Sequence, residues 1–583
     1  MIVSILLLIA SLFAGLSAAG HCVEEVSELP IGWQQLQDAP EPTYPLSISI
    51  ALRQSSASRS HERLTYSSSH LSAEEVRSLR APDQADVDAV MLWLQENGIE
   101  DATLKDDWIH VRTTVCKAES LLDMDVRLYS FKGKPPTLRT KKYSVPDSLS
   151  TPISFIHPLA NFMTPGRELL NAQPPPAQDV LQKRAVGLCS RFATPGCIRQ
   201  LYNLNYTTPD DSSSVRFAVA GFLGHRPGYQ NVDEFLSRYA PSLDSRGYNY
   251  SIELVDSAES FPDEPKPNAE SALHMDYAMA LGYPTDIIYH STSGRGVKVD
   301  GSGREVPMGD NDNEPYLALA QSLLDRSTDN LPHVLSITYH DDELSVPRPY
   351  AEKACDMFGF LAKRGVSIIV NSGDGGARGT EASTCRSNEG LNREITKATF
   401  PAACPWVTAV GATTSDAEPP SGATFSSGGF SQYFERKKWQ DKAVDGYVNA
   451  LGGHLKPYYN PNKRALPDIS VIGGQFPVFV NSQLRTLQGS GGSTAIFAAM
   501  IALINDARIR QGKGSLGWLN ERLYSPAVRA VLQDITDGTS TSCVFDGGKT
   551  PGGWPAKQGW DAITGLGVPK DFPAFMQALL DAN

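Results

Sequence analysis

Residues 487–506 read LQGSGGSTAIFAAMIALIND and combine a glycine-rich start with a long apolar run. Gly489, Gly491 and Gly492 disfavour a regular element, whereas residues 495–504 are apolar on nearly every side. The pattern predicts a tight turn that leads into a buried helix. Because the first turn of a helix offers free N–H groups and a favourable dipole, a serine hydrolase often places its nucleophile there. This stretch is therefore the candidate centre of the fold and of a catalytic site.

The composition indicates a globular protein without a polyanionic partner. The 583 residues, 41% of them hydrophobic, suffice for roughly two to four domains with sizeable cores. The 52 Lys and Arg residues against 65 Asp and Glu residues give a net charge of -13 at pH 7. This balance argues against nucleic acid or an anionic membrane as a partner, and it suits an acidic medium.

The first 19 residues have the pattern of a secretory signal peptide. Positions 2–13 are mostly apolar, and Ser17 and Ala19 are placed for cleavage by signal peptidase. The alternative, a membrane anchor, is disfavoured because the apolar stretch is short and breaks at Gly15. No later segment reaches about 18 uninterrupted apolar residues. We therefore expect a monomeric protein secreted to the extracellular space, with no part in the membrane.

Cysteine and asparagine patterns fit secretion. The eight cysteines show no metal-ligand spacing, and an even number in a secreted chain is typical of disulfides, although the sequence leaves their pairing open. They are Cys22, Cys116, Cys189, Cys197, Cys355, Cys385, Cys404 and Cys543. Asn205 and Asn249 begin Asn-X-Thr and Asn-X-Ser sequences, so they would be glycosylation acceptors if they lie on the surface.

Sequence texture divides the mature chain into an N-terminal unit (residues 20–161), a linker (residues 162–188) and a C-terminal domain (residues 189–583). The linker carries a proline run and the dibasic pair Lys183 and Arg184. The pair is equally consistent with proteolytic processing and with exposed linker charges.

The N-terminal unit has an α+β pattern. Residues 47–52 alternate like a strand, and residues 87–94 carry helical apolar spacing. Ser72 and Glu75 form a capping box, which predicts a helix start.

Beyond residue 189, short buried strands alternate with helices. Strands are expected at residues 215–223, 286–289, 334–339, 367–372 and 407–410, and helices at residues 269–281, 315–324 and 350–362. This alternation predicts a parallel, doubly wound α/β sheet. Ligands of such sheets gather beyond the carboxyl ends of the strands.

Several segments resemble the sedolisins, or serine-carboxyl peptidases, which include secreted fungal tripeptidyl-peptidases, and the resemblance covers nearly the whole chain. HLSAEEV (residues 70–76), residues 86–99 and YSVPDSL (residues 143–149) resemble the family's pro-domain. In CSRFATPGC, at the start of the peptidase domain, the resemblance implies a short disulfide between Cys189 and Cys197. The implied fold is a subtilisin-like, doubly wound parallel α/β domain preceded by an α+β pro-domain. Peptides or proteins are the implied ligands.

The family triad joins a Ser to a Glu and an Asp four residues apart on one helix face, so that the Asp holds the Glu that takes the serine proton. The matching helix reads AESALHMDY, residues 269–277; Glu270 matches the base and His274 stands at the Asp position. His274 could hydrogen-bond to Glu270, and at acidic pH we expect it to be cationic and to hold Glu270 ionised. Asp276 lies about 600° around the helix from Glu270 and is expected to face elsewhere. Without the family context, an ordinary helix-surface pair of Glu270 and His274 is an equally good interpretation.

The residue expected to stabilise the oxyanion matches the family pattern, whereas a residue of the expected substrate groove beside it differs from that pattern. SIIVNSGDGG, residues 367–376, matches the family's strand and Ser-Gly-Asp-x-Gly turn, which assigns Asp374 to oxyanion stabilisation. The strand 334–339 continues into His340, where the family has Gly. A side chain would thus replace bare backbone beside the substrate.

The nucleophile position departs from the family pattern Ser-Gly-Thr-Ser-Ala-Ser-x-Pro. Residues 488–495 align with it and place Gly491 at the nucleophile, which closes the acyl-enzyme route through this residue. Ser490 replaces the family Thr. Ser493 matches the second, non-nucleophilic Ser, turned by about 200° and so expected to point away from Glu270.

Three functions stay open on these residues. The first is a family member that has lost peptidase chemistry and binds or regulates peptides. The second is an acid-acting peptidase that releases tripeptides with Ser490 or Ser493 as substitute nucleophile. The third is an esterase-like hydrolase using Ser493, because Gly491-Gly-Ser-Thr-Ala resembles the G-x-S-x-G elbow, although its partner acid and His are not evident.

The resemblance also implies one Ca²⁺ near the C-terminus. The family's Asp-Ile/Val pair matches Asp534 and Ile535, and its Gly-x-Gly-Trp-Asp segment matches KQGWD, residues 557–561. Asp534 and Asp561 would supply carboxylate oxygens. Ile535, Lys557 and Gly559 would supply backbone carbonyls, so that Lys in place of Gly need not harm binding.

Overall fold

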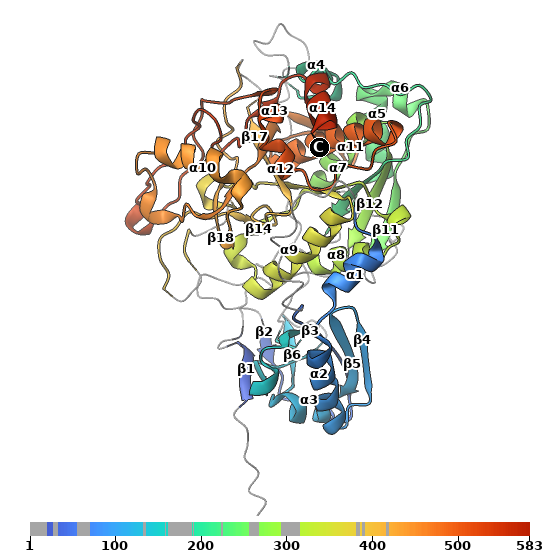
Figure 1. The fold of residues 1–583 in the computed structure, drawn as a ribbon, viewed down its shortest axis with the longest axis vertical. Helices are drawn as coiled ribbons and strands as arrows, with labels where there is room; N and C mark the ends of the chain where they lie inside the picture. The colour runs from blue at the N-terminus through green and yellow to red at the C-terminus, as the bar shows by residue number, and fades with distance from the viewer. Residues whose placement is uncertain are drawn as a thin grey trace, which may run out of the picture. The chain divides into compact units, whose positions relative to one another are not determined.

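The computed structural model describes residues 20–26, 29, 33–54, 70–131, 136–157, 159–160, 189, 192–222, 225–255, 268–292, 315–380, 385–387, 391–414 and 419–582 (Figure 1). The predicted signal peptide and the linker with Lys183 and Arg184 lie outside the described residues.

The chain divides into two compact units, which are described separately. Unit 1 comprises Met1–Leu29, Trp33–Arg59 and Arg80–Asn161. Unit 2 comprises Pro30–Gly32, Ser60–Leu79 and Phe162–Asn583. Helix α1 (Ala73–Arg80), at the predicted capping box, is therefore grouped with unit 2 as far as Leu79.

Unit 1 is an α+β structure. Its largest sheet has four antiparallel strands in the order β4 (Asp101–Lys105), β5 (Trp108–Thr114), β3 (Pro45–Leu52) and β9 (Ile153–His157). The other elements are α2 (Gln84–Glu96), α3 (Val115–Leu122), and the strands β1 (Gly20–Glu25), β8 (Lys142–Pro146), β2 (Trp33–Gln35), β6 (Arg127–Phe131) and β7 (Thr137–Arg139). Alternate strand residues such as Ile48, Ile50, Ile109 and Val111 are buried, as the predicted alternation requires.

Unit 2 is built on a seven-stranded sheet in which every neighbouring pair is parallel. Its order is β11 (Ser251–Val255), β12 (Asp286–Thr292), β10 (Arg216–Gly221), β13 (Val334–Ile337), β15 (Ser367–Asn371), β17 (Thr408–Thr413) and β20 (Ile469–Ile472). The prediction of a doubly wound parallel α/β domain is confirmed.

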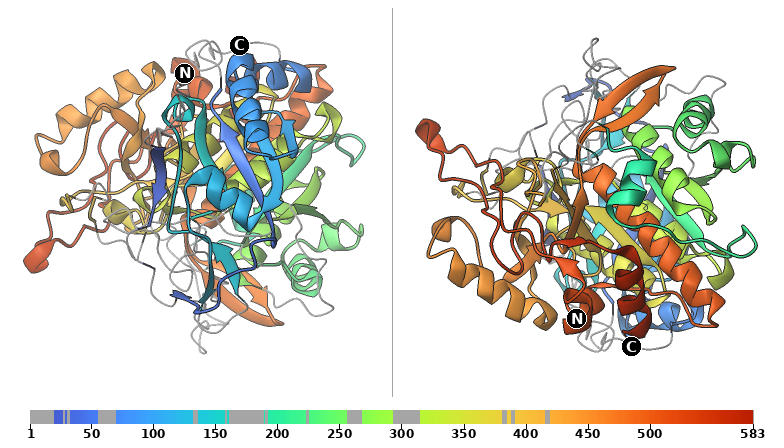
Figure 2. Two further views of the ribbon diagram at one scale, coloured as in Figure 1. Left: turned by 90° about the horizontal axis from the view of Figure 1, so that it is seen from below. Right: turned by 90° about the horizontal axis from the view of Figure 1, so that it is seen from above.

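Successive strand residues point to opposite sides of the sheet, and here both sets of side chains are apolar. Helices therefore cover both faces of this sheet. Phe217 and Val219 of β10 belong to one apolar cluster, and Ala218 and Ala220 to the other. The first cluster includes α7 (Ala269–Gly282) and α11 (Ser490–Arg510), which lie against each other (Figure 2). The second includes α8 (Tyr316–Leu324) and α9 (Arg348–Lys363).

Smaller elements complete unit 2. The strand pairs are β14 (Asp341–Asp342) with β16 (Thr399–Phe400), β18 (Gly429–Glu435) with β19 (Lys463–Leu466), β21 (Phe476–Val480) with β22 (Gln483–Leu487), and β23 (Leu532–Gln533) with β24 (Val568–Pro569). The helices are α4 (Pro195–Leu201), α5 (Tyr229–Tyr239), α6 (Pro241–Asp244), α10 (Lys438–Ala450), α12 (Asn520–Leu523), α13 (Pro526–Arg529) and α14 (Phe572–Asp581).

Helix α11 is the buried helix expected from residues 495–504, but it begins earlier. Gly489 alone has a positive φ here, of 152°, and the helix starts at Ser490, so that Gly491 and Gly492 lie in its first turn. A Cβ on Gly492 would come within 2.3 Å of the Phe476 ring. This glycine is therefore required by the packing against Phe476 and not by a turn. Among the described residues, α11 is also long and apolar enough to cross a membrane, yet 83% of that window is buried within unit 2, which is typical of a core helix.

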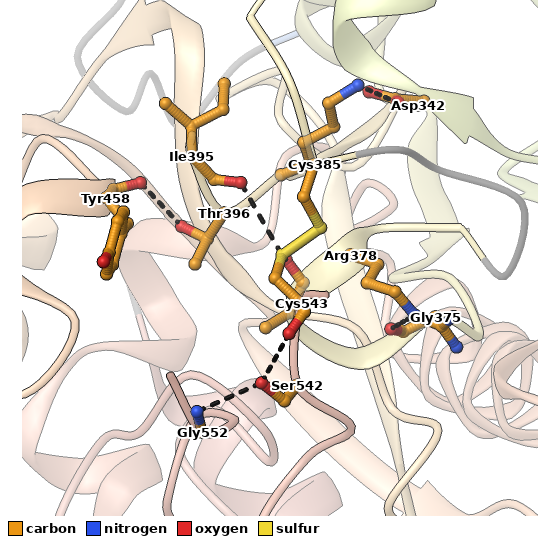
Figure 3. Close-up of a disulfide and its surroundings, with 12 residues drawn as sticks. Asp342, Gly375, Arg378, Cys385, Ile395, Thr396, Tyr458, Ser542, Cys543 and Gly552 are labelled. Carbon is orange, nitrogen blue, oxygen red and sulfur yellow. Dashed lines mark hydrogen bonds and ion pairs between the residues drawn. A yellow bond between two sulfur atoms is a disulfide. The ribbon is translucent and has the colours of Figure 1, made fainter. Parts of the chain in front are cut away.

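Three disulfides form within unit 2. Cys189 pairs with Cys197, as the resemblance implied. The two long-range pairs are Cys355–Cys404 and Cys385–Cys543. Figure 3 shows the latter, whose Cys543 Sγ also contacts the carbonyl oxygen of Ile395. Cys22 and Cys116 of unit 1 are free thiols, so the expectation from an even cysteine count is right for six of the eight.

Candidate functional site

The N-terminus of α7 carries Glu270, the candidate base. The Asn268 side-chain oxygen accepts hydrogen bonds from the backbone N–H groups of Glu270 and Ser271, at 2.8 and 3.3 Å, and so caps the helix. Glu270 is half-buried in the first helical turn, where the helix dipole favours a carboxylate. The cap fixes the register that puts His274 one turn further along.

His274 does not interact with Glu270 in the way we expected. Its side chain is 1% exposed, Nδ1 shares a hydrogen bond with Thr338 Oγ1, and Nε2 has no hydrogen-bond partner in the part of the chain that the structure describes. The expected hydrogen bond from His274 to Glu270 is therefore absent. Thr338, at the carboxyl end of β13, holds the ring in another orientation.

The surroundings of His274 disfavour the positive charge that we expected on its ring. Burial, with a smaller contribution from the neighbouring His225, lowers the pKa of His274 to about 3. The imidazole is therefore neutral over most of the acidic range, and it cannot keep Glu270 ionised by charge. A cation would need a carboxylate beside it, whereas the partner of this ring is the neutral hydroxyl of Thr338.

Gly491 and His274 face each other. A Cβ built on Gly491 would lie 2.8 Å from His274 Nε2, closer than real Cβ atoms approach another heavy atom. The free nitrogen of the ring thus points at the place where a nucleophilic side chain would begin. The two departures from the family pattern are one structural change, because the buried imidazole requires a residue without a side chain opposite.

Asp374 lies on the other side of the start of α11. Its Oδ1 accepts a hydrogen bond from the backbone N–H of Ser490 at 2.7 Å. A Cβ on Gly489 would lie 3.0 Å from its Oδ2, so the carboxyl group also lies against Gly489. Asp374 is half-buried after β15 and caps α11, which places a carboxyl beside the assigned nucleophile position.

Both candidate substitute serines are fully buried and engaged by backbone groups. Ser490 Oγ donates to the carbonyl of Gly373 at 3.1 Å and accepts from its N–H at 3.2 Å. Ser493 Oγ donates to the carbonyls of Ile472 and Val471, at 3.0 and 3.3 Å. Each hydroxyl therefore serves the packing of α11, and neither hydrogen-bonds to Glu270 or His274.

His340 lies beside the Asp374 turn. Its Nδ1 is 2.7 Å from Asn371 Nδ2, and a Cβ on Gly373 would approach its Cδ2 to 3.1 Å. The side chain is half-buried and stands next to the backbone that holds Ser490. All three departures, at positions 274, 340 and 491, therefore gather around the start of α11.

Sequence reasoning missed the residues that fix His274. Thr338 binds its Nδ1, and the Tyr339 ring lies 6.1 Å from the imidazole between centroids. Tyr339 O–H in turn lies 3.2 Å from His225 Nδ1. Their common signal is position, because Thr338 and Tyr339 follow β13 and His225 follows β10 at the carboxyl edge of the sheet.

Asp276 is fully buried, and neither carboxyl oxygen has a hydrogen-bond partner among the described residues. Burial raises its pKa well above the ordinary value, so the group is neutral. Since neither oxygen bonds to Glu270, Asp276 does not take the place of the Asp in the family pattern.

The predicted calcium ligands meet at one loop. Asp534 Oδ2 accepts from Gly559 N at 2.8 Å, and Asp561 Oδ2 accepts from Lys557 N at 3.2 Å. Burial raises the pKa of Asp534, and it raises the pKa of Asp561 to about 7. Asp561 is 0% exposed, and its Oδ1 also accepts hydrogen bonds from the backbone N–H groups of Ile563 and Thr564, at 3.0 and 2.8 Å.

An all-oxygen donor set of this kind fits a hard divalent cation. In the described part of the chain no three His, Cys, Asp or Glu side chains cluster as a metal site. The backbone carbonyls of Ile535, Lys557 and Gly559 would therefore have to supply the remaining ligands.

Comparison with known proteins gives matches to both units. A family model described as "Pro-kumamolisin, activation domain" matches residues 32–162. Tripeptidyl-peptidase SED2 of Arthroderma otae is 32% identical over 582 residues, which cover 96% of each chain. Tripeptidyl-peptidase sed4 of Aspergillus fumigatus is 33% identical over 612 residues, covering 98% of this chain and 100% of that protein.

Among solved structures, Pseudomonas sedolisin, a serine-carboxyl proteinase complexed with pseudo-iodotyrostatin, aligns with a TM-score of 0.48 at 17% identity. The alignment covers 68% of this chain and 100% of that one. The full-length sequence relatives are the stronger match.

Proposed function

The chain belongs to the sedolisin family of serine-carboxyl peptidases, and on that premise we propose that it is a tripeptidyl-peptidase homologue that binds peptides but is catalytically impaired. The observation that carries the proposal is the contact between His274 and Gly491. A buried, neutral imidazole stands 2.8 Å from the site of the missing Cβ, so the nucleophile is absent and its space is closed to a replacement.

The rest of the site supports peptide binding. Glu270 and Asp374 keep the positions that the family pattern assigns to the base and the oxyanion acid, and both are half-buried at helix starts. The relatives are named tripeptidyl-peptidases, so the ligand we propose is a peptide with a free amino terminus. His340 would lie along the bound peptide and narrow the groove.

The alternative of an active peptidase, with Ser490 or Ser493 as nucleophile, is less well supported. Activation of a serine needs a base within hydrogen-bond reach, and these hydroxyls bond to backbone groups of Gly373 and of Ile472. The same contacts disfavour an esterase that uses Ser493.

The decisive experiment is turnover by the purified full-length protein between pH 3 and 6. We expect no release of tripeptides from chromogenic peptides and no self-cleavage, while isothermal calorimetry detects binding of the same peptides. Ser490→Ala and Ser493→Ala serve as controls for residual chemistry. Turnover in the parent that either substitution abolishes would overturn the proposal, and absence of peptide binding would reduce it to a loss of function alone.

We further propose that one Ca²⁺ binds Asp534 and Asp561 together with the carbonyls of Ile535, Lys557 and Gly559. When bound, the ion would neutralise the two carboxylates and hold the loop 557–561 in place. Ligand binding to the folded state stabilises it by about 2.7 kcal/mol when free calcium is a hundredfold above Kd.

Chelation should accordingly lower the melting temperature, and calcium should restore it. Asp561→Asn should remove this response. Asp546→Asn, an exposed carboxylate that pairs with Arg386, is the matched control and should keep it. If chelator does not change the melting temperature of the parent protein, the proposed calcium site is excluded.

For location and processing, we propose that residues 1–19 are a signal peptide, residues 20–161 a pro-domain, residues 162–188 a linker, and residues 189–583 the peptidase-like domain. The activation-domain match over residues 32–162 and the disulfides support this organisation. Asn205 and Asn249 are exposed, as glycosylation acceptors must be. Expression in a secretory host, followed by N-terminal sequencing and endoglycosidase treatment, tests these assignments.

A further inference from the structure

A cavity of about 320 Å³ lies in unit 2 at the end of α10. Cavities of this size are typical of sites for small organic ligands. None of the residues that line it belongs to the candidate catalytic site, so the cavity is a separate feature of the chain. Its lining includes Leu451, His454, Thr539, Gly552, Pro555 and Lys557.

The imidazole of His454 is held in one orientation by two glycines. Its Nε2 lies 2.9 Å from the carbonyl oxygen of Gly553, so this nitrogen carries a hydrogen and donates it. A Cβ on Gly552 would lie 2.9 Å from its Cε1, so the ring packs directly on bare backbone. Nδ1 makes no hydrogen bond in the part of the chain that the structure describes. In the neutral ring Nδ1 is an acceptor, so the histidine has a lone pair left for an N–H group of a ligand.

The glycine loop that holds this ring is itself anchored. Gly552 N donates to Ser542 Oγ at 3.1 Å, and Ser542 precedes Cys543, one half of a disulfide (Figure 3). A Cβ on Gly553 would lie 1.6 Å from the carbonyl oxygen of Ser540, so only glycine fits there. Both glycines are therefore required by contacts, and this side of the cavity is formed before any ligand binds.

The end of α10 supplies an apolar wall. Ala450 and Leu451 line the cavity together with Pro555. The carbonyl of Tyr447, in the last turn of the helix, accepts the N–H of Leu451 at 2.9 Å, and the carbonyl of Pro555 accepts the Tyr447 hydroxyl at 3.0 Å. These polar groups are satisfied within the protein, so the wall suits an apolar group of a ligand.

The cavity carries a positive charge without a carboxylate partner. Lys557 lines it, at the position where the family pattern has Gly, and makes no ion pair among the described residues. Two carboxylates nearby in the sequence are engaged, since Asp561 accepts backbone N–H groups and Asp445 of α10 pairs with Arg436. The lining residues that the structure describes include no Asp or Glu. An ammonium group in this setting attracts a carboxylate, and the Thr539 hydroxyl adds a further donor.

We propose that this cavity binds the carboxyl-terminal residue of a peptide. The peptide carboxylate pairs with the Lys557 ammonium, its amide N–H donates to His454 Nδ1, and its apolar side chain packs on Leu451. An N-acylated apolar amino acid presents all three of these groups, whereas a simple acid lacks the N–H and a neutral amide lacks the charge. The binding needs no catalytic residue, so it stands or falls separately from the proposed function.

Calorimetry of the full-length protein at pH 8 tests the site with N-acetyl-L-leucine. The acetyl group removes the free amino terminus that the proposed function requires, so the candidate catalytic site does not account for its binding. We expect a dissociation constant on the order of 1 mM, as for a small ligand. N-acetyl-L-leucinamide, which lacks the charge, should bind at least about tenfold more weakly, and 4-methylpentanoate, which lacks the amide, about fivefold more weakly.

Three substitutions locate the ligand. Lys557→Met keeps the aliphatic stem and removes the charge, so it should weaken binding of N-acetyl-L-leucine at least about tenfold. His454→Phe keeps a ring on Gly552 without the acceptor, so it should abolish the preference for N-acetyl-L-leucine over 4-methylpentanoate. Ala450→Phe puts a large side chain at an exposed position of the lining and should block both ligands. Calcium is held constant throughout, because the carbonyl of Lys557 is a proposed ligand of that ion.

Lys442→Met changes another exposed lysine, on α10 and outside the lining, and this matched control should bind like the parent. The melting temperature of each variant reports whether it is folded, and Lys557→Gln replaces Lys557→Met if the latter is not. Equal affinities of the parent for N-acetyl-L-leucine and its amide would overturn recognition of a carboxylate. Equal affinities for N-acetyl-L-leucine and 4-methylpentanoate would overturn the assignment to a peptide terminus. Parent-like binding in both Lys557→Met and Ala450→Phe, or no binding by the parent at about 10 mM, would exclude the cavity as the site.

Discussion

The two sides of the start of α11 differ in how their polar groups are used. On one side, Asp374 accepts the N–H of Ser490, and the Ser490 hydroxyl bonds to both backbone groups of Gly373. On the other side, His274 Nε2 has no hydrogen-bond partner among the described residues and faces the bare backbone of Gly491. Asp374 and Ser490 stabilise the helix whether or not any reaction occurs, whereas a nucleophile at position 491 would serve chemistry alone. The half of the site that also holds the fold is the half that matches the family pattern.

The largest effect should come from changing the side of α11 on which His274 faces Gly491. The double variant His274→Asp, Gly491→Ser places an acid and a serine where the family pattern has them, and it removes the ring that would collide with the new side chain. We expect peptidase activity at acidic pH at least about 100-fold above the parent's background, because triad members act as a unit.

Each single variant of this pair should stay inactive, since Gly491→Ser alone meets the imidazole and His274→Asp alone lacks a nucleophile. Release of tripeptides from a chromogenic substrate is the measurement. If the double variant is silent, His340→Gly is added; silence of the triple variant would contradict the proposal that these three positions account for catalytic impairment.

The free energy of unfolding tests the contact between Gly491 and His274 without any need for catalytic activity. Gly491→Ala should destabilise the protein by about 1–3 kcal/mol, because its Cβ meets a buried ring anchored by Thr338. In the background His274→Ala the cost should largely vanish, and urea unfolding of the four proteins gives the coupling energy.

Gly446→Ala in α10 is the matched control for this cycle. A Cβ there meets no atom within 4 Å, so replacing a helical glycine should stabilise by about 0.5–1 kcal/mol. Independent effects of Gly491→Ala and His274→Ala would disprove the contact.

The buried imidazole should also appear in the pH dependence of unfolding. Its pKa is about 3 in the folded protein and near 6.5 when unfolded, so the unfolded state binds more protons between these values. Stability that is present above pH 6.5 is lost as the pH falls, by about 2 kcal/mol at pH 5. His274→Gln should reduce the loss between pH 7 and 5 by that amount, and equal losses in parent and variant would refute a neutral buried His274.

The smallest effect should come from the side on which Asp374 accepts the N–H of Ser490. Asp374→Ala removes a helix cap and should cost about 0.5–2 kcal/mol, typically about 1. Asp374→Asn retains an oxygen acceptor and should recover most of that. Differential scanning calorimetry compares the two; a larger cost for Asp374→Ala than for Gly491→Ala would reverse the comparison between the sides.

Local pattern was enough for most of the architecture. Strands and helices fall where apolar alternation and helical spacing place them, as in β15 and α7, because these periods reflect which face of an element is buried. The Cys189–Cys197 disulfide followed from the family resemblance, since the two residues are close in sequence. The pairs Cys355–Cys404 and Cys385–Cys543 join distant segments and could not be assigned from sequence.

The sequence by itself determined the family, the parallel α/β sheet and the residue types at each motif position, including His274 and Gly491. Only the tertiary structure decided what those residues do. The pKa of His274 depends on desolvation and on His225, which follows β10, and the ring is held by Thr338, which follows β13. The glycine at 491 makes room for a ring that is 217 positions earlier in the chain. Contacts of this kind arise from packing between distant segments, which no local spacing encodes.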